Sequence, residues 1–253
     1  GGIAISAVIS RCCALVFICV CLMKSDIRLD LRKKRMADLS CIRNILRIGI
    51  PGGISNISYS LSQVVSTSIL ALLGTTALSA KIYISTIVFY VYVIGMSLGL
   101  STAILIGWMT GAGQYEKAFR LNQQVLRIAV ILNISLSFCM FIFYKPLMEL
   151  FTSNTDIINM AKGILLIDIF VEIGRGFNHV EDNSLRGAGD VLFPMIVAII
   201  SCWCMSILFS YILGIRCRLG LYGCWIAFMM DEMFRGLLLW RRFRSRKWMK
   251  KKI

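Results

Sequence analysis

The sequence predicts an all-α integral membrane protein, a polytopic bundle of about seven membrane-spanning helices. Of its 253 residues, 58% are hydrophobic and only 16% are charged, whereas soluble domains carry roughly 25% charged residues. No Asp, Glu, Lys or Arg occurs between Arg47 and Lys81, or between Lys81 and Glu116. A helix needs about 20 apolar residues to cross a bilayer, so each stretch is long enough for one span and its turns.

The remaining predicted helices follow from the other apolar runs. The first run contains only Arg11 as a charged residue, and it lacks the basic start and small-residue cleavage site of a secretory signal. The second helix begins near Pro51, a residue suited to the first helical turn because its missing N–H has no helical partner there. The predicted spans are residues 2–23, 46–73, 82–110, 124–144, 158–178, 191–214 and 220–240.

The distribution of the basic residues predicts the orientation of these helices. The formal net charge is +15, and 15 of the 28 Lys and Arg residues lie in a linker, residues 24–45, and in a tail, residues 241–253. Such clusters beside helix ends mark cytoplasmic segments, so we expect both to be cytoplasmic in the plasma membrane and the tail to attract anionic lipid. The pattern indicates a lipid bilayer as the partner and argues against nucleic acid.

Enzymatic and metal chemistry find little support in the sequence. Most of the ten cysteines lie in apolar spans, no Cys-x-x-Cys pair occurs, and His179 is the only histidine, so we expect no metal site and no cofactor. No nucleophile and base converge at one depth, and we predict that the chain is not an enzyme. His179, Glu181 and Asp182 are interpreted as solvated residues of a short cytoplasmic turn.

Two helices carry polar or small side chains at helical spacing. Asn56, Ser60, Gln63 and Thr67 form a stripe along the predicted helix 46–73. This stripe is either the wall of a substrate cavity or a face that hydrogen-bonds to neighbouring helices. On helix 82–110, small residues recur every fourth position and predict close packing against another helix: Gly95, Gly99, Ala103, Gly107 and Gly111.

Three regions of the sequence resemble the multidrug and toxic compound extrusion (MATE) family. Residues 49–118 contain, in order, Gly-Ile-Pro-Gly-Gly, Leu-Gly-Thr-Thr-Ala-Leu-Ser-Ala, Gly-Met-Ser-Leu-Gly-Leu-Ser-Thr-Ala and Gly-Ala-Gly-Gln-Tyr-Glu-Lys-Ala. Residues 183–190 with Phe193-Pro194 look like the signature between the tenth and eleventh helices of the family. Residues 225–236 are similar to the last helix of many bacterial members.

The resemblance implies a domain organisation and a function. Residues 1–23 correspond to the last helix of an N-terminal lobe and residues 46–240 to the C-terminal six-helix lobe, so an N-terminal lobe is expected as a missing partner. The implied activity is efflux of organic cationic or amphiphilic compounds by alternating access and antiport with sodium ions or protons. The alternatives are a lipid-linked oligosaccharide flippase of the same superfamily and an inactive fragment.

Carboxylates inside the predicted membrane spans are candidates for the coupling-ion site. An ionisable side chain at mid-bilayer costs about 3 kcal/mol or more on insertion scales, and it is therefore expected to have an ion-pair or hydrogen-bond partner or a functional role. Asp168 and Glu172 lie four residues apart on one face of helix 158–178, and paired carboxylates in a low dielectric share a proton or hold a cation. The alternative is that Arg175 neutralises Glu172 and that Asp168 is a hydrogen-bonded core residue.

Other charged residues are predicted to form structural ion pairs. Arg235 follows Asp231 and Glu232 by four and three residues, so either acid can pair with it. Arg186 and Asp190, four residues apart, are expected to hold the turn that contains them. Some MATE subgroups place a cation-binding Glu on the helix that corresponds to residues 46–73, and this sequence has no acid there. The sequence therefore does not indicate whether sodium ions or protons are the coupling ion.

Overall fold

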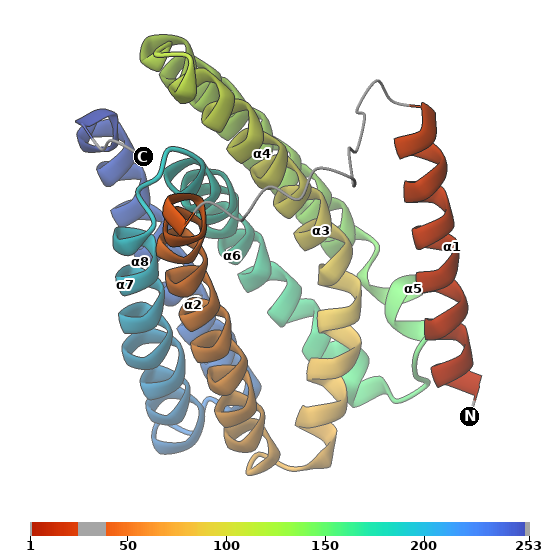
Figure 1. The fold of residues 1–253 in the computed structure, drawn as a ribbon. Helices are drawn as coiled ribbons and strands as arrows, with labels where there is room; N and C mark the ends of the chain where they lie inside the picture. Colours follow the sequence, from red (N-terminus) through yellow and green to blue (C-terminus); the bar gives the residue numbers. More distant parts are fainter. Residues whose placement is uncertain (1, 25–38, 251–253) are drawn as a thin grey trace. The chain divides into compact units, whose positions relative to one another are not determined.

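The computed structural model describes residues 2–24 and 39–250 (Figure 1). The chain divides into two compact units, Gly1–Arg43 and Asn44–Ile253. Helix α1 (Gly2–Lys24) belongs to the first unit, and its apolar side chains, such as Leu15 and Phe17, are exposed. Most of the predicted linker and the end of the predicted tail lie outside the described residues.

The other described helices run in close succession. Gly74 and Gly113 adopt positive φ angles in the turns on either side of α3, a conformation that glycine reaches without a Cβ clash. The bounds are α2 (Leu39–Ala71), α3 (Thr75–Gly111), α4 (Tyr115–Ile142), α5 (Tyr144–Glu149), α6 (Thr155–Gly187), α7 (Leu192–Ser201) and α8 (Gly220–Arg244), with π-helical turns at Cys202–Ile207 and Ser210–Arg216 and a 3₁₀ turn at Lys247–Lys250.

The predicted fold class is confirmed, since the described residues contain helices and no strand. Seven long helical segments of this part of the chain overlap the seven predicted ranges, but α2, α3 and α4 begin seven to nine residues earlier than predicted and α6 ends nine residues later. Helix α2 begins at Leu39, so the prediction that Pro51 lies in its first turn is wrong. By length and composition, four described segments are apolar enough to cross a membrane: Ile5–Lys24, Thr75–Gly111, Tyr115–Ile142 and Leu192–Arg216. The number of helices that span the bilayer stays a prediction, because α2, α6 and α8 carry more polar side chains.

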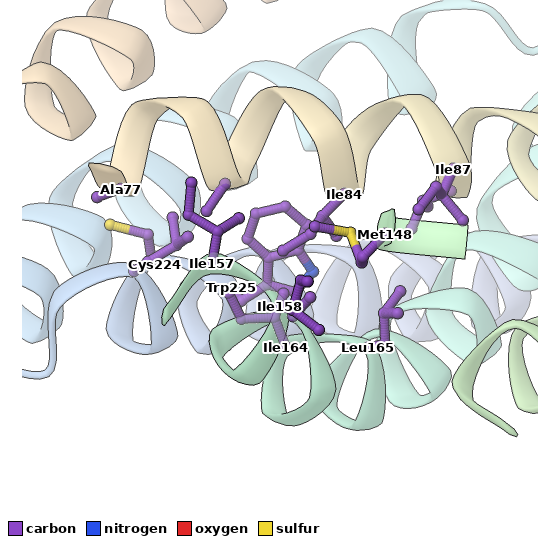
Figure 2. Packing of buried hydrophobic residues seen from close by; sticks show 14 of the residues in the cluster. Ala77, Ile84, Ile87, Met148, Ile157, Ile158, Ile164, Leu165, Cys224 and Trp225 are labelled. Atoms are coloured by element: carbon purple, nitrogen blue, oxygen red, sulfur yellow. The ribbon is translucent and has the colours of Figure 1, made fainter. Parts of the chain in front are cut away.

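Helix α6 is the central element of the second unit and packs against α3, α4 and α8. It begins where Asn154 caps the first turn, accepting a hydrogen bond from the backbone N–H of Asp156 at 2.9 Å. Figure 2 shows the largest apolar cluster, in which Ile84 of α3, Ile164 of α6 and Trp225 of α8 meet. This cluster packs together three of the helices that line the site described below.

The predicted small-residue ridge of α3 is a packing surface at Gly95, Gly99, Ala103 and Gly107, whereas a Cβ atom on Gly111 would have no atom within 4 Å. A Cβ atom on Gly95 would lie 3.1 Å from Asn133 Nδ2 and 3.2 Å from His179 Cδ2, and one on Gly99 would collide with the His179 carbonyl. A Cβ atom on Gly107 would lie 3.4 Å from the carbonyl oxygen of Gly187. The missing side chains therefore let α3 approach the second half of α6 closely, as small residues do in membrane helix pairs.

Candidate functional site

Two cavities lie within the second unit, one beyond the other. The larger has a volume of about 680 Å³ and reaches from Tyr59 to Lys81, Asp168 and Trp225. The smaller, about 510 Å³, reaches from Tyr59 toward Asn56 and the end of α6. Four side chains line both cavities: Tyr59, Tyr92, Cys202 and Glu232. The cavities are consecutive parts of one polar tract between α2, α3, α6, α8 and the α7 segment, which is Leu192–Arg216, comprising α7 and the π-helical turns that follow it.

Asp168 is the buried acid of the larger cavity. Its side chain is 1% exposed, and its Oδ1 atom accepts a hydrogen bond of 3.0 Å from the indole Nε1 of Trp225. Its Oδ2 atom is buried and accepts no hydrogen bond from the described residues. No arginine or lysine of this part of the chain forms an ion pair with it, so Asp168 is a buried carboxylate in the cavity lining whose second oxygen has no donor among the described residues.

Glu172 has a different environment, although it lies one turn beyond Asp168 on α6. It forms an ion pair with Arg175, and its Oε2 atom accepts a hydrogen bond of 3.1 Å from Asn133 of α4. It is not among the residues that line either cavity. The structure therefore brings the two predicted site acids to one helix but separates their surroundings, with Asp168 toward the cavity and Glu172 toward α4.

A chain of ion pairs joins α6 to α8 where the two cavities meet. Glu232 lies 3.0 Å from Arg235 and 3.7 Å from Arg175, measured between carboxylate oxygen and guanidinium nitrogen. It also accepts a hydrogen bond from Asn178. Asp231 lies 3.5 Å from Arg235 and accepts from Ser201. The predicted pairing of Arg235 with both acids is present in the structure, and Glu232 links the two arginines.

The formal charges of this region leave one carboxylate in excess. Four acids (Asp168, Glu172, Asp231 and Glu232) face the two arginines, Arg175 and Arg235, and Lys81 adds a third positive charge at the far end of the larger cavity. Four minus three leaves one negative charge when every acid is ionised. In a low dielectric such a charge requires a proton or a cation. Of these four acids, Asp168 is the one without an ion pair among the described residues. Glu181 is also buried without an ion pair in this part of the chain, but it lines neither cavity.

The residues of the polar stripe on α2 differ in their surroundings: some line a cavity and one hydrogen-bonds to a neighbouring helix. Asn56 lines the smaller cavity and Gln63 the larger. Thr67 accepts a hydrogen bond of 3.2 Å from Lys81 Nζ, and Ser60 is exposed and lines neither cavity. The hydrogen bonds to the α7 segment come from a neighbouring face, where Ser58 accepts from Trp203 and Ser62 from Cys202.

The interpretation of His179, Glu181 and Asp182 as residues of a short turn is wrong. Helix α6 continues to Gly187 because α3 packs along it through the small-residue ridge. The His179 ring contacts that of Tyr92 edge-on at 4.9 Å between centroids and lines the smaller cavity. Glu181 is fully buried and accepts a hydrogen bond of 3.3 Å from Asn122 of α4.

Arg186 and Asp190 each form an ion pair, but not with one another. Arg186 lies 2.7 Å from Asp182, and Asp190 lies 2.8 Å from Arg242 near the end of α8. The expected pair requires both residues on successive turns of one helix. Helix α6 ends at Gly187, so Asp190 turns away toward α8 instead.

Several residues of the site were not predicted from the sequence. Trp225, the donor to Asp168, was noted only as part of a family motif. Asn133 is an amide in an otherwise apolar span, and the cost of burying an unpaired amide in a membrane was a signal that could have identified it. Tyr59 and Tyr92 carry no such signal, since an aromatic residue in an apolar helix fits lipid or core equally well.

Comparison with known proteins places this fold among transporters. The MatE family model matches residues 51–212. An uncharacterized transporter of Bacillus subtilis, YisQ, is 37% identical over 251 residues, which are 99% of this chain and 55% of that protein. A probable multidrug resistance protein of Thermotoga maritima, NorM, is 27% identical over 257 residues, 100% of this chain and 54% of that protein. The chain thus spans about half the length of these curated relatives.

Solved structures share the same fold. The crystal structure of MATE in the straight conformation superposes with a TM-score of 0.79 at 20% identity, covering 90% of this chain and 52% of that one. A MOP superfamily transporter from Pyrococcus furiosus gives a TM-score of 0.71 at 20% identity over 81% of this chain and 45% of that one. The helical fold and these matches define a multi-pass membrane protein with the fold of MATE transporters. The chain belongs to the MATE family.

Proposed function

We propose that this chain forms the C-terminal part of a secondary active transporter that exports organic cationic or amphiphilic compounds in exchange for sodium ions or protons. The relatives named multidrug resistance proteins support this direction of transport. One observation carries the proposal: a buried acid without an ion-pair partner in the described region, Asp168, lines a cavity of about 680 Å³. That acid offers one site at which an ion and a substrate influence one another.

The lining of the larger cavity suits an organic cation. Five aromatic side chains contribute to it: Tyr59, Phe89, Tyr92, Trp225 and Phe228. Aromatic faces attract cations and contact flat apolar groups, and the excess carboxylate adds negative charge. Asn56 and Gln63 of α2 are proposed to make polar contacts with the substrate. Thr67 is proposed to orient Lys81 through their hydrogen bond. Ser60 is proposed to contact substrate only outside the two cavities.

Asp168 is proposed as the principal coupling residue, with Glu172 in a supporting role. When a proton or sodium ion occupies the open side of Asp168, the excess charge is neutralised and substrate attraction falls. When the ion leaves, the carboxylate again attracts a cationic substrate. Competition between ion and substrate for one charge is a simple basis for antiport. Glu172, held by Arg175 and Asn133, sets the position of Arg175 beside the cavity.

The flippase alternative predicts a different cavity. A lipid-linked oligosaccharide with a phosphate-containing head requires a cationic lining, and the larger cavity combines three acids with Lys81 and Arg175. The aromatic and acidic character of the lining therefore favours efflux. The remaining alternative, an inactive fragment, predicts no transport from the complete open reading frame that encodes this chain.

An efflux assay tests the proposal. The complete open reading frame is expressed in a bacterial strain that lacks its own multidrug pumps, and loss of ethidium fluorescence is followed after energisation. We expect energy-dependent efflux from the unmodified protein and its loss in Asp168→Asn. The matched control is Asp156→Asn, the same chemical change at an exposed position in the first turn of α6. Unaltered efflux in Asp168→Asn would remove this residue from the coupling site.

A further inference from the structure

A third cavity lies on the opposite side of α6 and α8 from the polar tract. It has a volume of about 390 Å³, and its walls are the apolar side chains of Ile173 and Phe177 on α6 and of Met233, Leu237 and Trp240 on α8. On α6 these positions lie about half a turn around the helix from Asp168 and Arg175. Met233 and Leu237 are 43% and 47% exposed, so the cavity is a groove in the outer surface of the helix pair.

Basic side chains continue the groove at one end. Leu237, Trp240 and Arg244 recur at spacings of three and four residues, so they form one stripe along α8. The Arg244 guanidinium lies over the Trp240 ring, 5.1 Å from its centroid, and Arg241 is exposed on the same turn. Among the described residues, no carboxylate lies within ion-pair distance of either arginine. The end of the groove is therefore positively charged, with no acid of this part of the chain neutralising it.

The groove together with its basic end is about as long as one leaflet of a bilayer. Eleven residues separate Met233 from Arg244, which is about 16 Å of helix at a rise of 1.5 Å per residue. Half of the roughly 30 Å hydrocarbon core is about 15 Å. A lipid whose phosphate contacts Arg244 would therefore place its acyl chain along the whole apolar groove.

We infer that the groove between α6 and α8 is a specific site for an anionic glycerophospholipid of the leaflet that faces the C-terminal tail. One acyl chain packs against Phe177, Leu237 and Trp240, and the headgroup phosphate accepts hydrogen bonds from Arg244 and Arg241. The occupant is a membrane lipid rather than a soluble phosphate, because a free phosphate would contact the arginines and leave the apolar groove beside them empty. This site does not depend on the proposed transport function.

Fluorescence quenching by brominated lipids tests the site. The complete protein is reconstituted in phosphatidylcholine that contains a small fraction of either brominated phosphatidylglycerol or brominated phosphatidylcholine. Bromine quenches tryptophan on contact, and the difference between the wild type and Trp240→Phe isolates the contribution of Trp240. We expect phosphatidylglycerol to quench Trp240 at a lower mole fraction, by about fivefold for each arginine involved, since each basic residue near an anionic lipid contributes about 1 kcal/mol.

Two charge variants distinguish a specific lipid site from nonspecific attraction of anionic lipid to the basic tail. Arg244→Gln is expected to lower the preference for phosphatidylglycerol about fivefold and to leave quenching by phosphatidylcholine unchanged. Lys247→Gln removes the same charge from an exposed position outside the groove and is expected to have no effect. Equal quenching by the two lipids in the wild type, or equal losses in Arg244→Gln and Lys247→Gln, would overturn the inference.

A second measurement covers the possibility that Trp240→Phe disturbs the fold. Mass spectrometry after detergent purification counts the phosphatidylglycerol retained per protein molecule. The wild type and Lys247→Gln are expected to retain it, and Arg244→Gln to lose most of it. Retention that is the same in all three proteins contradicts the assigned site.

Discussion

The substitution Arg235→Gln tests whether the ion-pair chain between α6 and α8 holds the bundle together. Arg235 contacts Glu232 at 3.0 Å and Asp231 at 3.5 Å, and its side chain is 14% exposed. Removal of one partner from a buried ion pair costs about 3–5 kcal/mol, because the other charge stays buried without compensation. Arg175 still lies 3.7 Å from Glu232, so we expect the lower end of this range, about 3 kcal/mol.

A matched control uses a more exposed pair on α6. Arg186 and Asp182 are 24% and 28% exposed and lie 2.7 Å apart, and exposed pairs contribute less than about 1 kcal/mol. Thermal unfolding in detergent, followed by size-exclusion chromatography, is expected to show a large loss for Arg235→Gln and a small one for Arg186→Gln.

The double substitution Arg235→Gln with Asp231→Asn completes the test. The loss of Arg235 leaves the charges of two acids uncompensated, and Asp231→Asn removes one of these charges. The double variant is therefore expected to unfold at a higher temperature than Arg235→Gln alone. Equal stability of Arg235→Gln and the wild type would refute the view that this pair is buried and coupled.

Three further substitutions test packing and hydrogen bonding. Gly174→Ala places a Cβ atom 2.7 Å from the Glu232 carbonyl carbon, and the overpacking is expected to lower the free energy of unfolding by about 1–3 kcal/mol. Its control is Gly53→Ala, where a Cβ atom would have no atom within 4 Å and no loss of stability is expected. Equal melting temperatures of the two variants would argue against the close crossing of α6 and α8. Asn133→Ala removes the donor to Glu172 at 3.1 Å and is expected to cost about 2 kcal/mol; unchanged unfolding would show that this contact is dispensable. Trp248→Ala empties a fully packed position beside Phe243 and is expected to speed tryptic cleavage of the basic segment from Arg241 to Lys247, whereas identical cleavage rates would show that Trp248 does not anchor it.

The fold class and the positions of the long helices could be predicted because a bilayer imposes a simple rule. Every uncharged run of sufficient length must form a helix that satisfies its own backbone, and the stretch between Lys81 and Glu116 leaves no other solution. The end of α6 could not be predicted in this way. Residues 179–187 are mostly polar. Their helical conformation depends on contacts with the small-residue ridge of α3, which the local sequence does not encode.

The site was predicted in part for a related reason. A carboxylate in an apolar span is conspicuous, so Asp168, Glu172, Asp231 and Glu232 could be identified from spacing alone. Their surroundings depend on other helices: Trp225 reaches Asp168 from α8 and Asn133 reaches Glu172 from α4. Helical spacing within one element cannot distinguish an acid that faces a cavity from an acid that faces a neighbouring helix.

The central claim, that Asp168 couples ion and substrate, is tested most directly in proteoliposomes. Substrate counterflow measures exchange without any ion gradient, whereas concentrative uptake requires coupling to an imposed sodium or proton gradient. We expect Asp168→Asn, which is neutral in every state, to show counterflow only at raised substrate concentrations and to lose gradient-driven uptake, while Asp156→Asn retains both activities unchanged. Full gradient-driven uptake by Asp168→Asn would contradict the account.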